Sequence, residues 1–300
     1  MKIDFFREHV TGPIVSIGTP FCRDGAIDYE GLRRFIDFTI QAGTKTILLT
    51  PGDSLYTVLT DPEVAEITKV TAEHIDKRVM FIAASGCWWT GKAVEYAQYA
   101  RDVGADATIV FPPIRGATER DLVGYYTTVA ENLPVFVLSG SLGALGVRKA
   151  LNCVQLLLDE VPNIAGLKED YCPEFIRQAC LMAHDKWAIF AGGQKQTHMD
   201  MLPYGCDGFM SIHMTFKPEI AHAYWDAILK KDMPRATGII RDYDMPIFRF
   251  LYSDFAAGGD AGLHALSEIA GICGRWRRNP LPDFTDEDME RLRAFLKKTY

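Results

Sequence analysis

Eight short apolar runs, each followed by a segment with the start signals and apolar spacing of a helix, recur along the first two thirds of the chain. This alternation of strands and helices is typical of α/β proteins with a parallel sheet. The runs are continuously apolar, as expected for strands of a parallel sheet that is covered on both sides. They span residues 14–18, 46–49, 79–83, 107–111, 135–138, 164–167, 188–191 and 208–211.

The number of strands favours a closed barrel over an open sheet. Eight strands with crossover helices fit a (β/α)8 barrel better than a doubly wound sheet, which usually has about five to seven strands and is the alternative. Three helical stretches follow the last strand, at residues 219–231, 233–251 and 285–298. We therefore expect an α/β protein with a (β/α)8 TIM barrel over residues 1–215. A C-terminal helical extension over residues 216–300 should belong to the same structural unit.

Composition restricts the class of partner. The chain has 32 basic and 39 acidic residues, a net charge of −7 and no basic block, which argues against binding to nucleic acid or an anionic membrane. Its seven cysteines are scattered without a C-x-x-C pair, so neither a disulfide framework nor a zinc site is expected. No secretory leader pattern or membrane-length apolar run is present. We expect a cytoplasmic protein that binds small molecules and needs no metal or cofactor.

One lysine stands out because catalytic groups of such barrels lie at the carboxyl ends of the strands. Lys168 directly follows the sixth apolar run, where a long cation facing the barrel mouth is partly desolvated. Desolvation favours the neutral amine, and a neutral amine can attack a carbonyl group to form a Schiff base. The alternative is an ion pair between Lys168 and Glu169 or Asp170 at the barrel rim.

A series of short motifs occurs in a characteristic order along nearly the whole chain. They are Gly12, Thr19-Pro20-Phe21, Asp24-Gly25, Ile27-Asp28, Gly52-Asp53, Gly104-Ala105-Asp106, Leu133-Pro134, Gly166-Leu167-Lys168-Glu169 and Gly205-x-Asp207-Gly208-x-x-Ser211. In this order and spacing the chain resembles the dihydrodipicolinate synthase / N-acetylneuraminate lyase family, as a divergent member. The resemblance implies a homo-oligomeric barrel enzyme, a tetramer or dimer, of the class I aldolase type. It also implies that Lys168 forms a Schiff base with pyruvate or a related 2-oxo acid.

The turn after the second strand departs from the family pattern. Members typically carry Gly-Thr-Thr-Gly-Glu there, and the matching residues are 49–53, Leu-Thr-Pro-Gly-Asp. In the family the two threonines hold the substrate carboxylate through hydroxyl and backbone N–H groups. Thr50 keeps one hydroxyl, but Pro51 has no N–H to donate. Carboxylate binding should therefore be weaker or differently arranged.

The proton-relay residues of the family are also missing. The strand-five tyrosine falls on Leu138, the second relay tyrosine on Ile114, and the arginine that follows strand five in synthases on Gly143. Leucine cannot transfer a proton. The resemblance therefore argues for a Schiff-base lyase that is not a true dihydrodipicolinate synthase.

His213, just beyond the eighth strand, is the first candidate for a replacement proton relay, because imidazole titrates near neutrality. Its alternative role is a hydrogen-bonded loop histidine. Ser139 and Tyr171 rank below it. The predicted catalytic residues are Lys168, Thr50 and His213, and the predicted substrate-binding residues are Thr50, Gly52, Asp53, Ser139, Gly192 and Met210.

Two functions remain open at this point. The first is a lyase or aldolase that acts on pyruvate, another small 2-oxo acid or an aldehyde, with Lys168 as the covalent nucleophile. The alternative is a catalytically impaired family member that serves as a small-ligand-binding or regulatory protein. Loss of the relay tyrosines favours the second function, and retention of Lys168 favours the first.

Overall fold

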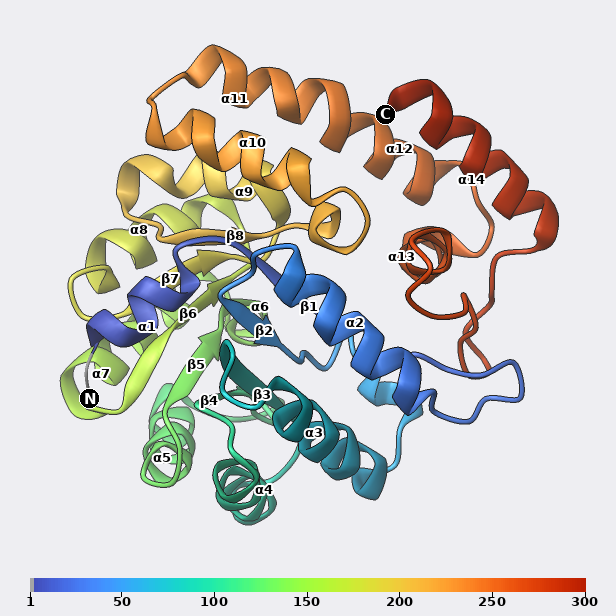
Figure 1. Cartoon of the computed structure of the whole chain (residues 1–300). Helices are drawn as coiled ribbons and strands as arrows, with labels where there is room; N and C mark the ends of the chain where they lie inside the picture. Colours follow the sequence, from blue (N-terminus) through green and yellow to red (C-terminus); the bar gives the residue numbers. More distant parts are fainter. Residues whose placement is uncertain (1–2) are drawn as a thin grey trace.

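Eight parallel strands close into a barrel whose spatial order follows the chain, with β1 paired to both β2 and β8 (Figure 1). The computed structural model describes residues 3–300, so Met1 and Lys2 of the expected barrel range lie outside the described residues. The predicted (β/α)8 barrel is confirmed. The strands are β1 (Gly12–Ser16), β2 (Thr46–Leu48), β3 (Met80–Cys87), β4 (Ala107–Phe111), β5 (Val135–Leu138), β6 (Ile164–Glu169), β7 (Ala188–Ala191) and β8 (Gly208–Met210).

The strand bounds agree closely with the apolar runs, and one difference matters for function. β4, β5 and β7 coincide with the expected runs, whereas β6 continues past its run to Glu169. Lys168 and Glu169 pair with Phe190 and Ala191 of β7, so the ladder extends through both charged residues. Lys168 is thus held by the sheet itself and does not lie in the loop that follows.

Helices surround the barrel in the order expected from the sequence (Figure 1). α1 (Ile3–Val10) packs against β6 and β7. Within residues 3–300 no helix is both long and apolar enough to cross a membrane. The other helices up to β8 are α2 (Tyr29–Gln41), α3 (Asp61–Ile75), α4 (Thr90–Val103), α5 (Glu119–Ala130), α6 (Ser139–Leu142), α7 (Val147–Glu160), α8 (Pro173–Ala183) and α9 (Gln194–Met201), with short 3-10 turns η1 (Tyr56–Val58), η2 (Gly143–Leu145) and η3 (Leu202–Tyr204).

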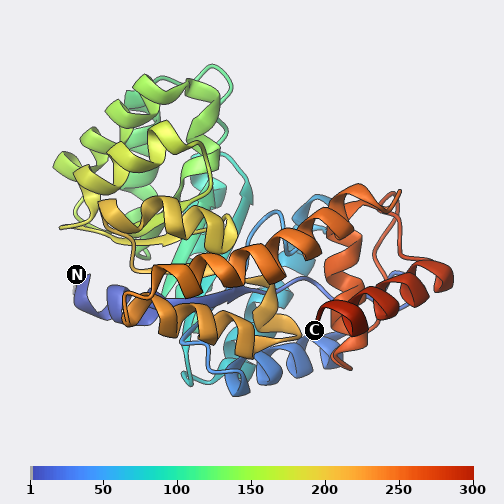
Figure 2. The same ribbon diagram turned by 90° about the horizontal axis from the view of Figure 1, so that it is seen from above.

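The C-terminal helices gather on one side of the barrel (Figure 2). After β8 and the 3-10 turn η4 (Ile212–Thr215) come α10 (Pro218–Leu229), α11 (Met233–Ile239), the π-helical segment η5 (Ile240–Asp244), α12 (Met245–Ser253), α13 (Gly258–Ile269) and α14 (Asp286–Thr299). α13 is not among the helices predicted from the sequence. Its first turn contains two glycines, which are poor helix formers. Burial of Ala261, Ala265 and Leu266 against Leu251 stabilises this helix.

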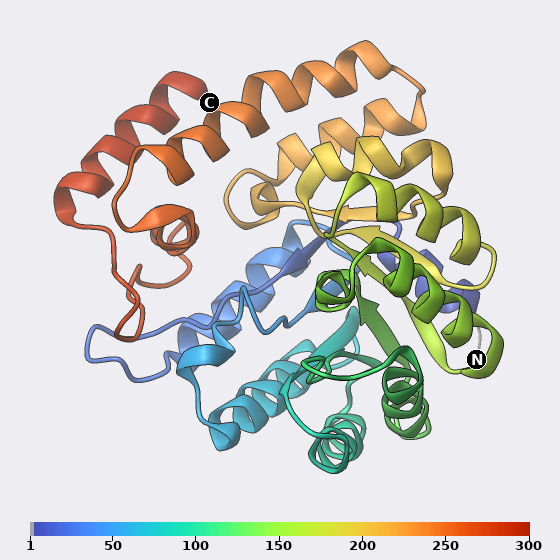
Figure 3. The same cartoon turned by 180° about the vertical axis from the view of Figure 1, so that it is seen from behind.

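An arginine near the C-terminus ties this helical extension to the first loops of the barrel. Arg278 makes two hydrogen bonds to the carboxylate of Glu63 and donates to the carbonyl oxygens of Gly25 and Val58. Figure 3 shows the red C-terminal loop reaching the blue loop between β1 and α2. These contacts join the segment between α13 and α14 to the β1–α2 loop, to η1 and to α3.

Candidate active site

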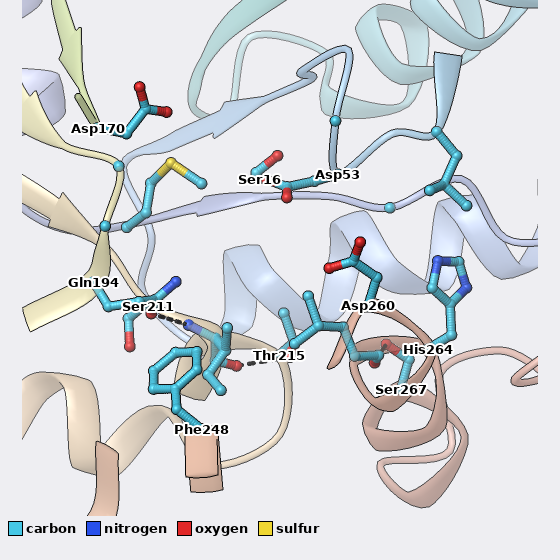
Figure 4. Close-up of a pocket in the computed structure, with 18 of the residues that line it drawn as sticks. Ser16, Asp53, Asp170, Gln194, Ser211, Thr215, Phe248, Asp260, His264 and Ser267 are labelled. Atoms are coloured by element: carbon cyan, nitrogen blue, oxygen red, sulfur yellow. Dashed lines mark hydrogen bonds between the residues drawn. The ribbon is translucent and has the colours of Figure 1, made fainter. Parts of the chain in front are cut away.

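A cavity of about 490 Å³ lies at the carboxyl ends of the strands (Figure 4). One wall consists of strand ends and the loops that follow them, and the other consists of α12 and α13. The residues that define these walls are Ser16, Gly52, Asp53, Lys168, Asp170, Gly192 and Met210 on the barrel side, and Phe248, Tyr252, Asp260, His264 and Ser267 on the helical side. The cavity therefore occupies the place where catalytic groups lie in barrels of this kind.

Lys168 reaches this cavity from β6. The side chain is 7% exposed, and its Nζ forms an ion pair with Oδ2 of Asp170. Gly192 makes room for the amine, because a Cβ atom at that position would lie 2.6 Å from Nζ. The ion pair that the sequence allowed with Glu169 or Asp170 thus forms with Asp170, at the edge of the cavity.

Asp170 is held by the residues that follow β5. Its Oδ1 accepts hydrogen bonds from the hydroxyl of Ser139 at 3.3 Å and from the backbone N–H of Gly140 at 3.1 Å. The backbone N–H of Asp170 donates in turn to the hydroxyl of Ser139 at 2.9 Å. Ser139, predicted to bind substrate, is fully buried and lies behind the cavity wall. It positions Asp170.

The turn after β2 brings three predicted residues together. The backbone N–H of Asp53 donates to the hydroxyl of Thr50 at 3.0 Å, which closes the turn around Pro51. Gly52 and Asp53 line the cavity, and Thr50 is buried just behind them. The Thr50 hydroxyl also lies 3.5 Å from the hydroxyl of Ser16. The sequence analysis missed Ser16, although alternation along β1 places it on the same face as Gly18, which also lines the cavity.

His213 does not reach the cavity, contrary to the role expected from the sequence. Its side chain is fully buried, with Nδ1 3.1 Å from Nζ of Lys195 and Nε2 2.8 Å from the hydroxyl of Tyr300. Burial, together with the positive charge of Lys195, lowers the pKa of His213 well below its ordinary value. The expectation of titration near neutrality fails for this physical reason, so we assign His213 no proton-transfer role.

The positions of the missing relay residues are occupied by groups that cannot move protons. Leu138 is the register partner of Lys168 on β5 and is 9% exposed. Ile114 is half-buried and packs against the core. Tyr171, a lower-ranked candidate, donates its hydroxyl to the carbonyl oxygen of Gly143 and does not line the cavity.

The cavity is rich in carboxylates. Asp53, Asp170 and Asp260 line it, Lys168 is its one lysine, and no arginine occurs among its lining residues within 3–300. His264 is neutral, since burial and the nearby Arg277 lower its pKa to about 3. The wall formed by α12 and α13 therefore offers neutral and acidic hydrogen-bonding groups.

The sequence analysis missed this helical wall. Burial, Asp260 and Asp53 raise the pKa of Tyr252 to about 12, so its phenol stays protonated beside the carboxylates. Tyr252 donates to Asp260 at 3.3 Å. Asp260 and His264 carried no local signal because α13 was not predicted as a helix, whereas the helix that contains Phe248 was predicted but not assigned to the site. Within residues 3–300 no group of three or more His, Cys, Asp or Glu side chains is arranged to hold a metal ion.

The chain is similar to known proteins over most of its length. The model of the dihydrodipicolinate synthetase family matches residues 9–299. A 4-hydroxy-tetrahydrodipicolinate synthase of Methylibium petroleiphilum is 32% identical over 236 residues, which cover 77% of this chain and 79% of that protein. The crystal structure of dihydrodipicolinate synthase from Aquifex aeolicus is similar with a TM-score of 0.79 and 25% identity, covering 96% of this chain and 97% of that one.

A third similar protein was solved with a ligand. It is a prophage protein of the dihydrodipicolinic acid synthase family from E. coli K12, in complex with pyruvate, with a TM-score of 0.81, 22% identity and coverage of 96% of this chain and 98% of that one. At this identity the likeness concerns the fold. The match of the family model over nearly the whole chain carries the assignment. The chain therefore belongs to the dihydrodipicolinate synthetase family, whose members are class I aldolase-type lyases.

Proposed function

We propose that Lys168 forms a Schiff base with pyruvate or another small 2-oxo acid, and that the enzyme makes or breaks a carbon–carbon bond next to the imine. The observation that carries this proposal is the position of Lys168 at the end of β6, buried, with its amine at the edge of a cavity. Oδ2 of Asp170 contacts Nζ, so it is placed to accept the proton that the amine must lose before it attacks a carbonyl group. The pyruvate complex of the similar E. coli protein supports this choice of substrate class.

In this proposal the substrate carboxylate binds beside the turn after β2. Pro51 lacks the N–H that the family uses there, and the hydroxyl of Ser16 lies next to that of Thr50 at the same wall. We therefore assign Ser16, Thr50 and the backbone of Gly52 to carboxylate binding.

The other reacting carbonyl compound differs from that of a true dihydrodipicolinate synthase. Aspartate semialdehyde carries a carboxylate of its own, and no arginine lines the cavity within the described residues to bind it. The wall opposite Lys168 instead presents Asp260, His264 and Ser267. These groups suit an uncharged, hydroxyl-bearing aldehyde. We therefore propose that the protein is not a true dihydrodipicolinate synthase.

Borohydride reduction tests this proposal. The protein is incubated with pyruvate and a panel of 2-oxo acids, reduced, digested and analysed by peptide mass spectrometry. We expect an adduct on Lys168, and none in Lys168→Met, which keeps an unbranched side chain one atom shorter and has no amine. Lys149→Ala, at an exposed position, is the matched control and should form the adduct normally. Absence of any adduct on Lys168 across the panel contradicts the proposal.

The second candidate function is a small-ligand-binding or regulatory protein. The presence of Leu138 in place of a relay tyrosine favours it. The adduct-forming 2-oxo acid is then incubated with the protein and a series of uncharged aldehydes. An adduct on Lys168 without carbon–carbon bond turnover for any of these aldehydes would support this second function. We also propose that the chain assembles as a dimer or tetramer, as its family resemblance implies, and light scattering of the purified protein tests this assembly.

A further inference from the structure

We infer that Asp170 is the acid/base catalyst of this enzyme and performs the proton transfers for which the family uses tyrosine. This inference rests on the proposed Schiff-base function of Lys168. It concerns a carboxylate that lies in direct contact with the reacting nitrogen atom. A general acid/base must be within hydrogen-bonding distance of the proton that it moves, and Asp170 meets this condition before substrate binds.

The geometry singles out Asp170 among the titratable groups of the cavity. Its Oδ2 contacts Nζ of Lys168, and its side chain is 29% exposed toward the cavity that both residues line. The other carboxylates, Asp53 and Asp260, have no hydrogen bond or ion pair with Lys168 within the described part of the chain. Figure 4 shows Asp170 near one end of the cavity and Asp260 and His264 toward the other.

Hydrogen bonds hold Oδ1 of Asp170 in place, whereas Oδ2 faces the amine of Lys168. Ser139 and Gly140 both donate to Oδ1, so the carboxylate is fixed while Oδ2 points at the amine. Gly140 is required for this approach, because a Cβ atom there would lie 2.8 Å from Oδ1. Preorganisation of this kind is what a catalytic group needs, since reorientation during the reaction is avoided.

The other residues considered as proton-transfer groups cannot act on Lys168 or its substrate, because of their chemistry or their position. Leu138, the register partner of Lys168, has no proton to give. The hydroxyl of Tyr171 is engaged with the carbonyl oxygen of Gly143, and His213 is buried away from the cavity. Asp170 is therefore the residue that can serve both the nitrogen and the substrate atoms bound to it.

Schiff-base formation proceeds with a balanced transfer of protons. The Lys168 ammonium gives one proton to Oδ2 of Asp170, and the resulting amine attacks the carbonyl carbon of pyruvate. The acid protonates the former carbonyl oxygen and takes back the surplus proton of the nitrogen, which yields a neutral carbinolamine. Asp170 then gives this proton to the hydroxyl group, which leaves as water while the C=N bond of the iminium forms. Asp170 ends this step as a carboxylate.

The same carboxylate activates the methyl carbon. It removes one methyl proton from the iminium; the C–H electron pair forms the C=C bond, and the C=N π electrons become the lone pair of the enamine nitrogen. When the enamine attacks an aldehyde, the acid protonates the new alkoxide. In D2O the acid exchanges its proton, so reversal of the methyl step places deuterium on pyruvate.

Deuterium exchange measures proton transfer by Asp170 independently of Schiff-base formation on Lys168. Wild-type protein, Asp170→Asn and the surface control Asp185→Asn are incubated with pyruvate in D2O, and loss of the methyl signal is followed by proton NMR. Borohydride trapping on Lys168 is measured in parallel after long incubation. We expect Asp170→Asn to form the adduct but to exchange at least about 100-fold more slowly, the usual contribution of a general base. Asp185→Asn should match wild type.

The variant Asp170→Ala tests whether Asp170 transfers protons or only holds Lys168 in place. Asp170→Ala leaves space for a free carboxylate, so added formate should restore part of the exchange rate, which a merely structural residue would not allow. An adduct with unchanged exchange in Asp170→Asn overturns the inference alone. Loss of the adduct in folded Asp170→Asn also overturns it, because Asp170 would then only hold Lys168 in place. Absence of an adduct in wild-type protein overturns the proposed function.

Discussion

Leu138 on β5 and Lys168 on β6 are register partners, so the lysine stands next to an aliphatic residue at the end of the barrel. In this register the family places a tyrosine next to its lysine. The hydrogen-bonding partner of Lys168 is instead Asp170, two residues further along the chain. The proton-transfer group has moved from the neighbouring strand to the loop after the lysine's own strand.

Because Leu138 is the register partner of Lys168, a tyrosine at position 138 should restore part of the proton transfer that is lost without Asp170. Leu138→Tyr in the Asp170→Asn background returns a phenol to the neighbouring strand, and we expect it to recover part of the lost methyl exchange. Leu138 is 9% exposed, so the larger side chain should lower the free energy of unfolding by about 1–3 kcal/mol. NMR exchange and urea unfolding measure the two effects. Leu138→Phe, which adds the ring without the hydroxyl, should show the destabilisation without the recovery.

Glu169 predicts a loss of stability as the pH rises from about 4.5 to about 8. The side chain is fully buried, and burial raises the pKa of its carboxyl to about 8 from 4.5. The stability that this group contributes is complete below its unfolded pKa and is lost as the pH rises through about 8, at about 1.4 kcal/mol per pH unit between the two values.

Glu169→Gln tests this dependence. The amide cannot ionise, and its oxygen can still accept the backbone N–H of Tyr171 as the carboxyl does. Urea unfolding across this pH range should therefore show a flatter profile for the variant, which becomes the more stable protein above about pH 8. Parallel profiles for the two proteins would show that Glu169 is ionised throughout.

His264 predicts a loss of stability in acid. Because burial and Arg277 lower its pKa to about 3 from 6.5, the unfolded chain binds a proton below pH 6.5 that the folded protein does not. This group's contribution is present above pH 6.5 and falls as the pH decreases toward 3, by about 2 kcal/mol between pH 6.5 and about pH 5. His264→Gln should remove this portion of the slope in denaturant unfolding. If the pH dependence of stability is the same in His264→Gln and the wild type, His264 must already be protonated in the folded protein over this pH range.

Arg278 predicts a stability effect at the junction of barrel and extension. Arg278→Ala removes two hydrogen bonds to Glu63, and we expect a loss of about 1–3 kcal/mol in urea unfolding. Hydrogen bonding to Arg278 lowers the pKa of Glu63 from 4.5 to about 2. The contribution of Glu63 is therefore present above pH 4.5 and is lost as the pH falls through about 2.

The same junction offers a matched control. Arg249→Ala removes an exposed arginine from α12 and should leave stability unchanged. The difference between wild type and Arg278→Ala should shrink in acid, because protonated Glu63 loses the ion pair in the wild-type protein. A difference that stays constant down to about pH 2 would mean that the contacts to Gly25 and Val58, and not the ion pair, hold the extension.

Part of the site could be predicted because it depends only on which residues follow each strand along the chain. An apolar run of strand length that ends in a lysine defines both β6 and the place of Lys168, since the barrel directs the carboxyl ends of all strands to one mouth. Gly52, Asp53, Gly192 and Met210 follow from the same rule. Their chemistry is set by which residues immediately follow each strand, and that information is contained in the sequence.

Local sequence patterns predict the eight-strand barrel, the lysine at the end of β6 and the absence of a tyrosine at the end of β5. Tertiary structure alone decided which groups surround that lysine. Asp170 becomes a fixed partner only because Ser139 and Gly140 come from the neighbouring strand end. His213 was lost to the site because long-range packing placed Lys195 and Tyr300 around it. The physical reason is that side-chain burial and charge depend on contacts between distant segments, which no local pattern records.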